Sequence, residues 1–519
     1  MRQKPYSQPT PGHYRLAQNI RIVGELAICD YPLRAMKLST TALRLLHLCA
    51  EQHTCEELAH HIDLPVKRIE TLCEQLRWKG LLEAGPARPP AAWPQVSIII
   101  PSHNRAYQLE RCLRSLFVMD YPVHNGLEII VVDDASTDET STMLQQLLQE
   151  PVARGKEIHI IHHSHQQGVA RCRNAGAEAA HYDLLAYIDS DCVASPNWLA
   201  DLVPAFQDVH IGAIGGLIRA YERHSMLGRY EDVRSSLFMG SHPQQVRLEG
   251  PLTYLPTANF LVRRSIWQQL GGFAPLAFGE DVDFCRRLLN TSFNILYLPQ
   301  GTVYHDYRTR LWPFISIHAF YASSEAALLQ RHPSERRVLL LPPEQATFAA
   351  LLIGSLWGMI IGYNLHRDKG EKNARKPSLP LCSLLAALLL IFLGARNRLR
   401  KVHKQHIPIG PLPVLRATLR GHLSYTYHLC RHLTRYYTLP LLIIGIFLPP
   451  LLLLVLILIT IVVAVDYVRL RPEMGPGQYA FCSLLDDCSY QVGVISGSIK
   501  HKTWKPLLPI VKLRQRREL

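Results

Sequence analysis

Residues 184–192 read LLAYIDSDC, an apolar stretch that runs directly into two aspartates. The five apolar residues predict a buried β-strand. Asp189 and Asp191 are two residues apart, and because alternate residues of an extended backbone point the same way, both carboxylates can face one cation. Mg²⁺ and Mn²⁺ prefer such oxygen ligands. An Asp-x-Asp pair alone is more often a solvated turn, but its position after a buried strand favours a metal site.

Strand patterns alternate with helical patterns on both sides of this stretch. Apolar strands are predicted at 96–100, 127–132 and 158–161, with helical patterns between them. This order is typical of an α/β fold with a mostly parallel, Rossmann-like sheet, which we expect over residues 96–335. Such a sheet binds its ligand in a crevice at the carboxyl ends of its strands. The two aspartates stand at one of these ends.

Other chemistry-bearing side chains follow predicted strands. Asp133 and Asp134 end the strand in VVDDASTDET (131–140), where adjacent like charges are unfavourable in a buried strand. A turn-forming role for these two acids is the alternative. His305 follows a strand pattern in VYHDY (303–307). A single histidine is often structural, but one that returns near an Asp-x-Asp site can complete the coordination shell of a cation.

A third acidic pair follows a glycine-rich loop in GGFAPLAFGEDVDF (271–284). The glycines allow the loop to approach a ligand closely, and Glu280 and Asp281 then stand at the start of a helix. The alternative is a purely structural role, in which the two acids form an acidic first turn of the helix. Transfer of a group to a hydroxyl requires a carboxylate base opposite the leaving group, and this pair is the best candidate for that base.

The order of these segments resembles glycosyltransferase family 2, the inverting enzymes with the GT-A fold. The matching segments are SIIIPSHNR (97–105), EIIVVDDAS (128–136), GVARCRNAG (168–176), YIDSD (187–191), GGF and GEDVDF within 271–284, and the late His305. The resemblance implies a GT-A nucleotide-sugar-binding domain and a metal-dependent, inverting hexosyltransferase. His103 is a departure, since family members often carry an aromatic residue there.

The resemblance also implies a role for each matching residue. It assigns Asp281 as the catalytic base, with Glu280 beside it, and Asp191 and His305 as ligands of Mn²⁺ or Mg²⁺. Pro101 and one of the two strand-end acids would hold uridine. The nucleotide-sugar site as a whole would comprise Pro101, Asn104, Arg105, Asp133, Asp134, Arg173, Asn174 and Asp189.

The N-terminal residues 1–83 read as a small domain of their own. Short strands over 14–37 and three helical patterns, one with a capping box of Thr54 and Glu57, predict a winged-helix-like unit. Such a unit binds DNA, binds a peptide at a strand edge or serves as scaffold, and we favour the peptide, because the third helix mixes acidic with basic residues. A Pro-rich linker follows at 84–95.

Apolar runs at 346–363, 379–395 and 439–465 predict a membrane-associated helical region over 336–470, followed by an amphipathic basic tail over 471–519. Both segments that connect the runs are basic, so the positive-inside rule places both in the cytoplasm. A bent hairpin at 439–465 reconciles this with a membrane location. The sequence does not decide how the first two runs lie relative to the membrane.

Charge and cysteine content bound the location. The formal charge of +14 is concentrated around the apolar runs and favours an anionic membrane face over nucleic acid. The 12 cysteines form no CxxC pair, which indicates reduced thiols, and the N-terminus lacks the apolar core of a signal peptide. We expect a plasma-membrane protein whose catalytic domain lies in the cytoplasm and which binds no nucleic acid.

The whole layout resembles a narrower group, the mycofactocin-system glycosyltransferases, with a PqqD-like front domain and an apolar C-terminal part that includes a stretch like 478–509. This implies UDP-glucose as donor, a peptide-derived redox cofactor or its growing glycan as acceptor, and a precursor peptide at the N-terminal domain. One alternative is a polysaccharide or glycolipid synthase, disfavoured because no Gln-x-x-Arg-Trp motif follows Asp281. The other is an inactive peptide-binding membrane adaptor, disfavoured by the intact acids.

Overall fold

The computed structural model describes residues 12–30, 33–85, 89–122, 126–248, 250–369 and 378–513. The chain forms two compact units, each built from separate stretches of sequence. Unit 1 comprises Met1–Arg88, Val338–Val462 and Val511–Leu519, and unit 2 comprises Pro89–Arg337 and Val463–Ile510.

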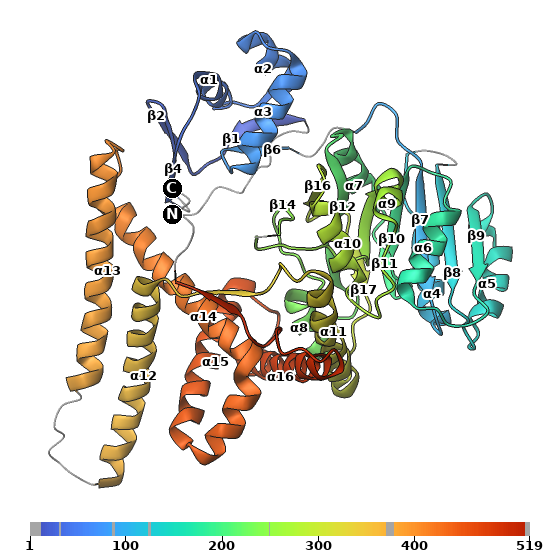
Figure 1. Ribbon diagram of the computed structural model, residues 1–519. Coiled ribbons are helices and arrows are strands. Elements are labelled where there is room, and N and C mark those ends of the chain that lie inside the picture. Colours follow the sequence, from blue (N-terminus) through green and yellow to red (C-terminus); the bar gives the residue numbers. More distant parts are fainter. Residues whose placement is uncertain are drawn as a thin grey trace. The chain divides into compact units, whose positions relative to one another are not determined.

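Unit 2 is built on an eight-stranded sheet (Figure 1) with the order β14-β16-β12-β15-β10-β7-β8-β9. Strands β10, β7, β8 and β9 are mutually parallel, as are β12 and β16, whereas β15 runs antiparallel to both of its neighbours. The strands are β7 Val96–Ser102, β8 Leu127–Asp133, β9 Glu157–His162, β10 Leu184–Ile188, β12 Ile211–Gly215, β14 Gln244–Gln245, β15 Asn259–Arg263 and β16 Asn294–Tyr297. The predicted α/β fold with a parallel-rich sheet is confirmed, and the antiparallel β15 is an addition that the sequence did not indicate.

Packing at the centre of this sheet explains its regularity. Every residue of β7 is buried, as expected for a parallel strand covered on both faces. Helix α6 (Val169–Ala179) lies close to β7, because a Cβ at Gly176 would come within 2.5 Å of the Ile99 side chain. Four aromatic side chains that contact one another belong to the same buried core as Ile99: Tyr187, Phe260, Phe273 and Phe284.

A second, three-stranded sheet in unit 2 has the order β11-β17-β13. Its strands are β11 Cys192–Ala194, β13 Ile218–Ala220 and β17 Val303–His305. The register places Cys192 opposite His305 on one side, and Ala220 opposite His305 on the other. The remaining helices of Pro89–Arg337 are α4 Ala106–Phe117, α5 Thr140–Gln149, η1 Pro151–Ala153, α7 Trp198–Leu202, η2 Val203–Gln207, α8 Met226–Arg234, α9 Arg264–Leu270, α10 Glu280–Leu289 and α11 Leu311–Arg331.

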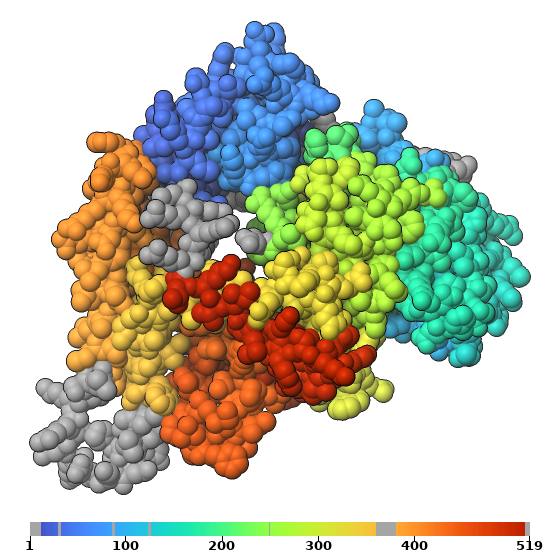
Figure 2. Space-filling model, in the orientation of Figure 1, coloured from blue at the N-terminus to red at the C-terminus, as the bar shows by residue number. Residues whose placement is uncertain are grey.

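Residues 471–510, which the sequence predicted as the first part of an amphipathic basic tail over 471–519, belong to unit 2. Helix α16 (Pro476–Lys500) lies against α11 (Figure 1), and β19 (Ile510–Lys512) follows it. A Cβ at Gly493 or Gly497 would collide with the α11 backbone at Ala319 or Ser323, so the two helices touch almost backbone to backbone. Figure 2 shows red side chains of this segment beside the yellow side chains of α11. The sequence prediction missed this because both glycines stand in a helix that also carries many polar residues.

The N-terminal part of unit 1 contains the predicted short strands and three helices. The strands are β1 His13–Leu16, β2 Ile20–Val23, β3 Leu26–Asp30, β4 Leu33–Lys37, β5 His53–Thr54 and β6 Leu82–Ala84, arranged as β5-β1-β6 and β2-β3-β4. The helices are α1 Thr40–Leu48, α2 Cys55–Ile62 and α3 Val66–Trp78. The capping box is confirmed, since Thr54 Oγ1 accepts from the Glu57 amide at 3.2 Å and Glu57 Oε2 accepts from the Thr54 amide at 2.8 Å. Its identity as a winged-helix domain stays a prediction.

Long helices carry the predicted apolar runs. They are α12 Pro343–Lys369, α13 Ser378–Lys404, α14 Pro411–Phe447 and α15 Pro449–Leu470, and the short strand β18 (Val338–Leu340) precedes them. Among the described residues, two helical segments are long and apolar enough to cross a membrane, Pro380–Lys404 and Pro449–Leu470. The run at 439–465 is broken between α14 and α15, whose side chains then pack together at Cys430 and Leu458. This agrees with the expected bend, and the membrane location stays a prediction.

Candidate functional site

Arg173 joins two of the acidic groups that the sequence singled out. It lies on α6 and is 3% exposed. Its Nη2 donates to Asp189 Oδ1 at 2.7 Å, and its Nη1 donates to Glu280 Oε1. Burial alone would lower the pKa of Arg173, but the two carboxylates outweigh this effect and raise it. The strand-end aspartate after β10 and the start of α10 are therefore held together by one buried cation.

Asp281 lies next to this cluster, at the second residue of α10. Burial and the neighbouring charge of Glu280 raise the pKa of Asp281 to about 7, although Arg173 acts in the opposite direction. The charge of Asp189 also contributes to the increase. A carboxylate with a pKa near neutrality is suited to accept a proton from a hydroxyl and to release it again.

Asp191 and His305 meet across the second sheet. His305 Nε2 lies 3.5 Å from Asp191 Oδ1, and the neighbouring Cys192 brings its thiol within 4.8 Å of both groups. The buried His305 Nδ1 has no hydrogen-bond partner among the described residues. A carboxylate oxygen and an imidazole nitrogen at this separation, each with a lone pair that can bind a metal, fit a divalent cation.

Two arginines also approach Asp191. Arg105 Nη1 donates to Asp191 Oδ2 at 2.5 Å, and Arg308 Nη1 lies 3.9 Å from the same oxygen. Burial would raise the pKa of Asp191, but His305 and the two guanidinium groups lower it, so the carboxylate is ionised at neutral pH. These contacts occupy Oδ2 and leave Oδ1 directed at His305.

Asp133 and Asp134 have separate roles in the turn that follows β8. Asp134 accepts hydrogen bonds from the amides of Gln167 and Gly168, both at 2.8 Å, and contacts His163 Nδ1 at 2.9 Å. Burial would raise the pKa of Asp134, but these hydrogen bonds lower it. Asp134 thus anchors the loop that leads into α6. Asp133 contacts His162 Nδ1 at 3.1 Å, and its carboxylate makes fewer hydrogen bonds than that of Asp134.

Three residues of the first motif lie at the end of β7. Pro101 is paired with Val132 of β8 within the sheet. Asn104 has a positive φ of 52°, and its Oδ1 accepts from the amide of Thr137 at 2.7 Å. His103 Nδ1 contacts the carbonyl of Asp134 at 2.8 Å. These contacts join the loops after β7 and β8 into one rigid edge.

Asn174 fixes the glycine-rich loop before Asp281. Its Nδ2 donates to the carbonyl of Phe273, and its Oδ1 accepts from the amide of Phe273, each at 2.8 Å. A Cβ at Gly272 would come within 2.6 Å of Asn174 Oδ1, so the loop can approach α6 only with glycine there. Asn174 is therefore a positioning residue for the loop in this structure.

The sequence interpretation missed two residues of this region. Cys192 ends the stretch LLAYIDSDC, but only the pairing of β11 with β17 places it beside His305. Arg308 follows the VYHDY stretch, and its closeness to Asp191 depends on the same pairing. The order of the strands along the chain carries no signal for this small sheet.

Residues 97–271, which include most of this region, match the family model for glycosyl transferase family 2. This match lies on the α/β fold with a parallel-rich sheet described above. Over a longer stretch the chain is similar to the pre-mycofactocin glycosyltransferase of Mycobacterium tuberculosis, with 29% identity over 445 residues, which cover 83% of this chain and 86% of that protein.

Two more distant similarities were found. Glycosyltransferase AglE of Haloferax volcanii is 25% identical over 206 residues, which cover 39% of this chain and 64% of that protein. Among solved structures, the mannosyltransferase PcManGT from Pyrobaculum calidifontis, in complex with GDP-Man and Mn²⁺, is 16% identical with a TM-score of 0.39, covering 66% of this chain and 88% of that one.

Proposed function

We propose that the protein transfers a hexose, glucose from UDP-glucose, with inversion onto a hydroxyl of a peptide-derived acceptor of the pre-mycofactocin type or onto its growing glycan. The similarity to pre-mycofactocin glycosyltransferase, which extends over 83% of the chain, supports the acceptor class. The observation that carries the proposed chemistry is Asp281, a carboxylate with a pKa of about 7 beside the Arg173 cluster of a family 2 domain.

The proposed reaction is a single displacement. Asp281 accepts the proton of the acceptor hydroxyl, whose oxygen attacks the anomeric carbon while the bond from that carbon to the UDP oxygen breaks. One displacement inverts the anomeric centre, so an α-linked donor gives a β-linked product. Arg173 and Arg105 carry the positive charge that is nearest to the acids of the site. Asp191 and His305 would hold Mn²⁺ or Mg²⁺, which neutralises charge on a leaving diphosphate.

The Asp281→Asn variant tests this assignment. We expect turnover to fall by about 10²- to 10⁴-fold, the usual contribution of a general base. Asn keeps the size of the side chain, and among the described residues no hydrogen bond or ion pair joins Asp281 to Pro101, Asp133 or Asp134, so UDP affinity should stay within about two-fold of the native value. Radiolabelled transfer from UDP-glucose and calorimetric titration with UDP measure the two quantities. Retained turnover would remove Asp281 from the role of base.

The two alternatives give different products in the same assay. An inactive adaptor would release no UDP from UDP-glucose with Mn²⁺ present, and a polysaccharide synthase would make long chains where the proposed enzyme adds few sugars. A panel of UDP and GDP sugars, screened by metal-dependent thermal stabilisation, identifies the donor. We also propose that α13 and α15 attach the protein to the plasma membrane with its catalytic domain in the cytoplasm, and that the N-terminal domain binds a precursor peptide.

A further inference from the structure

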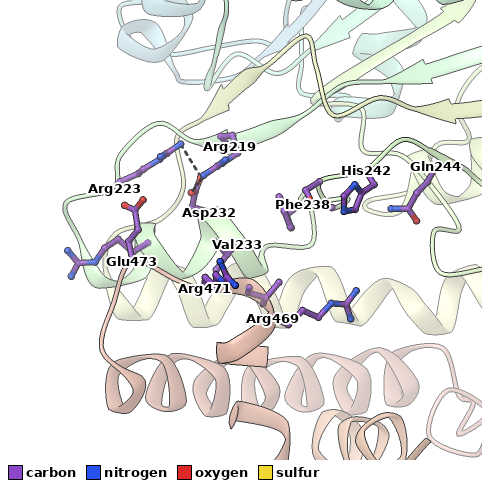
Figure 3. Close-up of a pocket in the computed structure, with 14 residues that line it drawn as sticks. Arg219, Arg223, Asp232, Val233, Phe238, His242, Gln244, Arg469, Arg471 and Glu473 are labelled. Atoms are coloured by element: carbon purple, nitrogen blue, oxygen red, sulfur yellow. Dashed lines mark hydrogen bonds and ion pairs between the residues drawn. The ribbon is translucent and has the colours of Figure 1, made fainter. Parts of the chain in front are cut away.

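An arginine-rich cavity of about 470 Å³ lies in unit 2, apart from the residues of the candidate glycosyltransferase site. Its wall comes from β13, α8, the 238–244 segment, the last residues of α15 and the chain that follows it (Figure 3). The lining residues that matter are Arg219, Arg223, Arg229, Asp232, Arg469, Arg471 and Glu473. Five arginines face two carboxylates, an excess of three positive charges in one cavity.

The arginines of this cavity fall into two groups. Arg219 donates to Asp232 through Nε at 2.8 Å and Nη2 at 2.5 Å, and Arg223 Nη2 lies 3.5 Å from the same carboxylate. Figure 3 shows both side chains directed at Asp232. Burial would raise the pKa of Asp232, but Arg219 lowers it, so the carboxylate is ionised. These two arginines are therefore already partly neutralised.

The other three arginines have no such partner. Within the described part of the chain, no side-chain ion pair or hydrogen bond is formed by Arg229, Arg469 or Arg471, and the buried Nε of Arg229 is without an acceptor. A buried guanidinium N–H without an acceptor is energetically unfavourable. Three arginines line this cavity without an ion-pair partner among the described residues, and this favours the binding of an anion with several oxygen atoms.

The backbone at Arg471 points to the same conclusion. Arg471 follows the last residue of α15 with a φ of 48°, and its amide donates to the carbonyl of Tyr467 at 3.0 Å. This left-handed position after a helix is usually taken by glycine, because a side chain there is disfavoured. The chain nevertheless places an arginine there, and this arginine is one of the residues that line the cavity.

We propose that this cavity binds a phosphate or diphosphate group. Arginine pairs with phosphate through two parallel hydrogen bonds, and three free guanidinium groups offer more donors than the two oxygens of a carboxylate can accept. The volume exceeds that of a single phosphate and suits a diphosphate or a phosphorylated head group. The inference uses none of the residues assigned to glycosyl transfer and is independent of the proposed function.

The neighbouring helix favours a lipid as the source of this phosphate. Helix α15 has a mean hydropathy of 3.0 over its apolar window, and 28% of that window is buried. It ends at Leu470, which lines the cavity together with Arg469 and Arg471. Basic residues at the end of an apolar helix usually lie at the level of the lipid phosphates. An anionic lipid head group can therefore reach the cavity beside the helix that would anchor the protein.

The test uses the full chain in neutral detergent micelles, so that the apolar helices are covered equally in every sample. Phosphatidylglycerol, phosphatidylcholine or soluble pyrophosphate is titrated, and the midpoint of thermal unfolding is recorded. We expect a saturable increase with phosphatidylglycerol and none with phosphatidylcholine. The same increase with pyrophosphate alone would also support the cavity as a phosphate site, with a soluble source.

Variants locate the effect. The pair Arg469→Gln and Arg471→Gly should weaken the stabilising ligand by at least about ten-fold, since a hydrogen bond to a charged group contributes about 1.5–3 kcal/mol. Glycine at position 471 suits the left-handed backbone, so the ligand-free protein should be no less stable. Arg154→Gln removes an exposed arginine elsewhere in unit 2 and serves as the control. Equal titrations for the native protein and the pair, or an equal loss in the control, would overturn the proposal.

Discussion

At the scale of single residues, the pKa of Asp281 gives the proposed chemistry a measurable signature. Only the ionised carboxylate can accept a proton, and burial together with Glu280 raises its pKa to about 7. Below that pH the protonated form dominates, so kcat/KM should fall about ten-fold per pH unit, and above it the rate should reach a plateau. Initial rates between pH 5 and 9 give the profile.

A neighbouring substitution checks the origin of that signature. Glu280→Gln removes the like charge beside Asp281 and leaves Arg173 with fewer carboxylates to neutralise. Both changes favour the ionised form of Asp281, so the acidic limb should move to lower pH. A limb that stays near pH 7 in this variant would show that another group controls the rate.

The sequence predicted these residues unequally. Asp189 follows the strand 184–188 as expected, because a buried run of apolar residues fixes both the strand and its end. The division of labour between Asp133 and Asp134 could not be predicted, since it depends on amides of a loop more than thirty residues later in the chain. The ion pair of Arg173 with Glu280 spans a still larger separation of 107 residues, and no local pattern encodes it.

At the scale of secondary structure elements, the contact between α11 and α16 depends on two glycines. Gly493→Ala or Gly497→Ala places a methyl group against the α11 backbone at Ala319 or Ser323. Because backbone cannot move aside as a side chain can, we expect each substitution to lower the free energy of unfolding by about 1–3 kcal/mol. Denaturation with urea, followed by tryptophan fluorescence, measures the change.

The same helix supplies a control for this prediction. A Cβ at Gly477, in the first turn of α16, meets nothing within 4 Å. Gly477→Ala should therefore be neutral or slightly stabilising, because alanine favours the helix by about 1 kcal/mol over glycine. If all three substitutions had the same effect, helix propensity rather than the close contact with α11 would determine stability.

The helices and strands differ in how well the sequence predicts them. The regular strands and the capped helix α2 were predicted because apolar periodicity and a capping box are local signals. Strand β15 (NFLVR) was not, since its three apolar residues do not indicate a strand direction and its antiparallel pairing with β10 and β12 is decided by the whole sheet. Helix α16 was read as a tail because its buried face carries glycines and polar residues instead of large apolar ones.

At the scale of the whole molecule, the catalytic unit is discontinuous in sequence. Its first stretch ends at Arg337 and its second begins at Val463. Between them in the sequence lie helices α12 to α14, which belong to unit 1. His318 of α11 joins the stretches, because its Nδ1 contacts Asp486 of α16 at 2.7 Å and its Nε2 contacts Glu231 of α8 at 2.6 Å. The two acids raise the pKa of His318 to about 9, although burial opposes them.

A truncation tests whether the catalytic unit needs its C-terminal stretch. The family match ends at residue 271, and the sequence placed the catalytic boundary at 335, so a chain ending at residue 470 would contain every predicted site residue. It would lack α16, however, and would leave the buried face of α11 uncovered and His318 without Asp486. We expect this chain to aggregate or to lose transfer activity. A chain ending at residue 513 should stay monodisperse and active. Gel filtration in detergent and the transfer assay distinguish the two, and an active, monodisperse 1–470 chain would show that residues 96–335 fold independently.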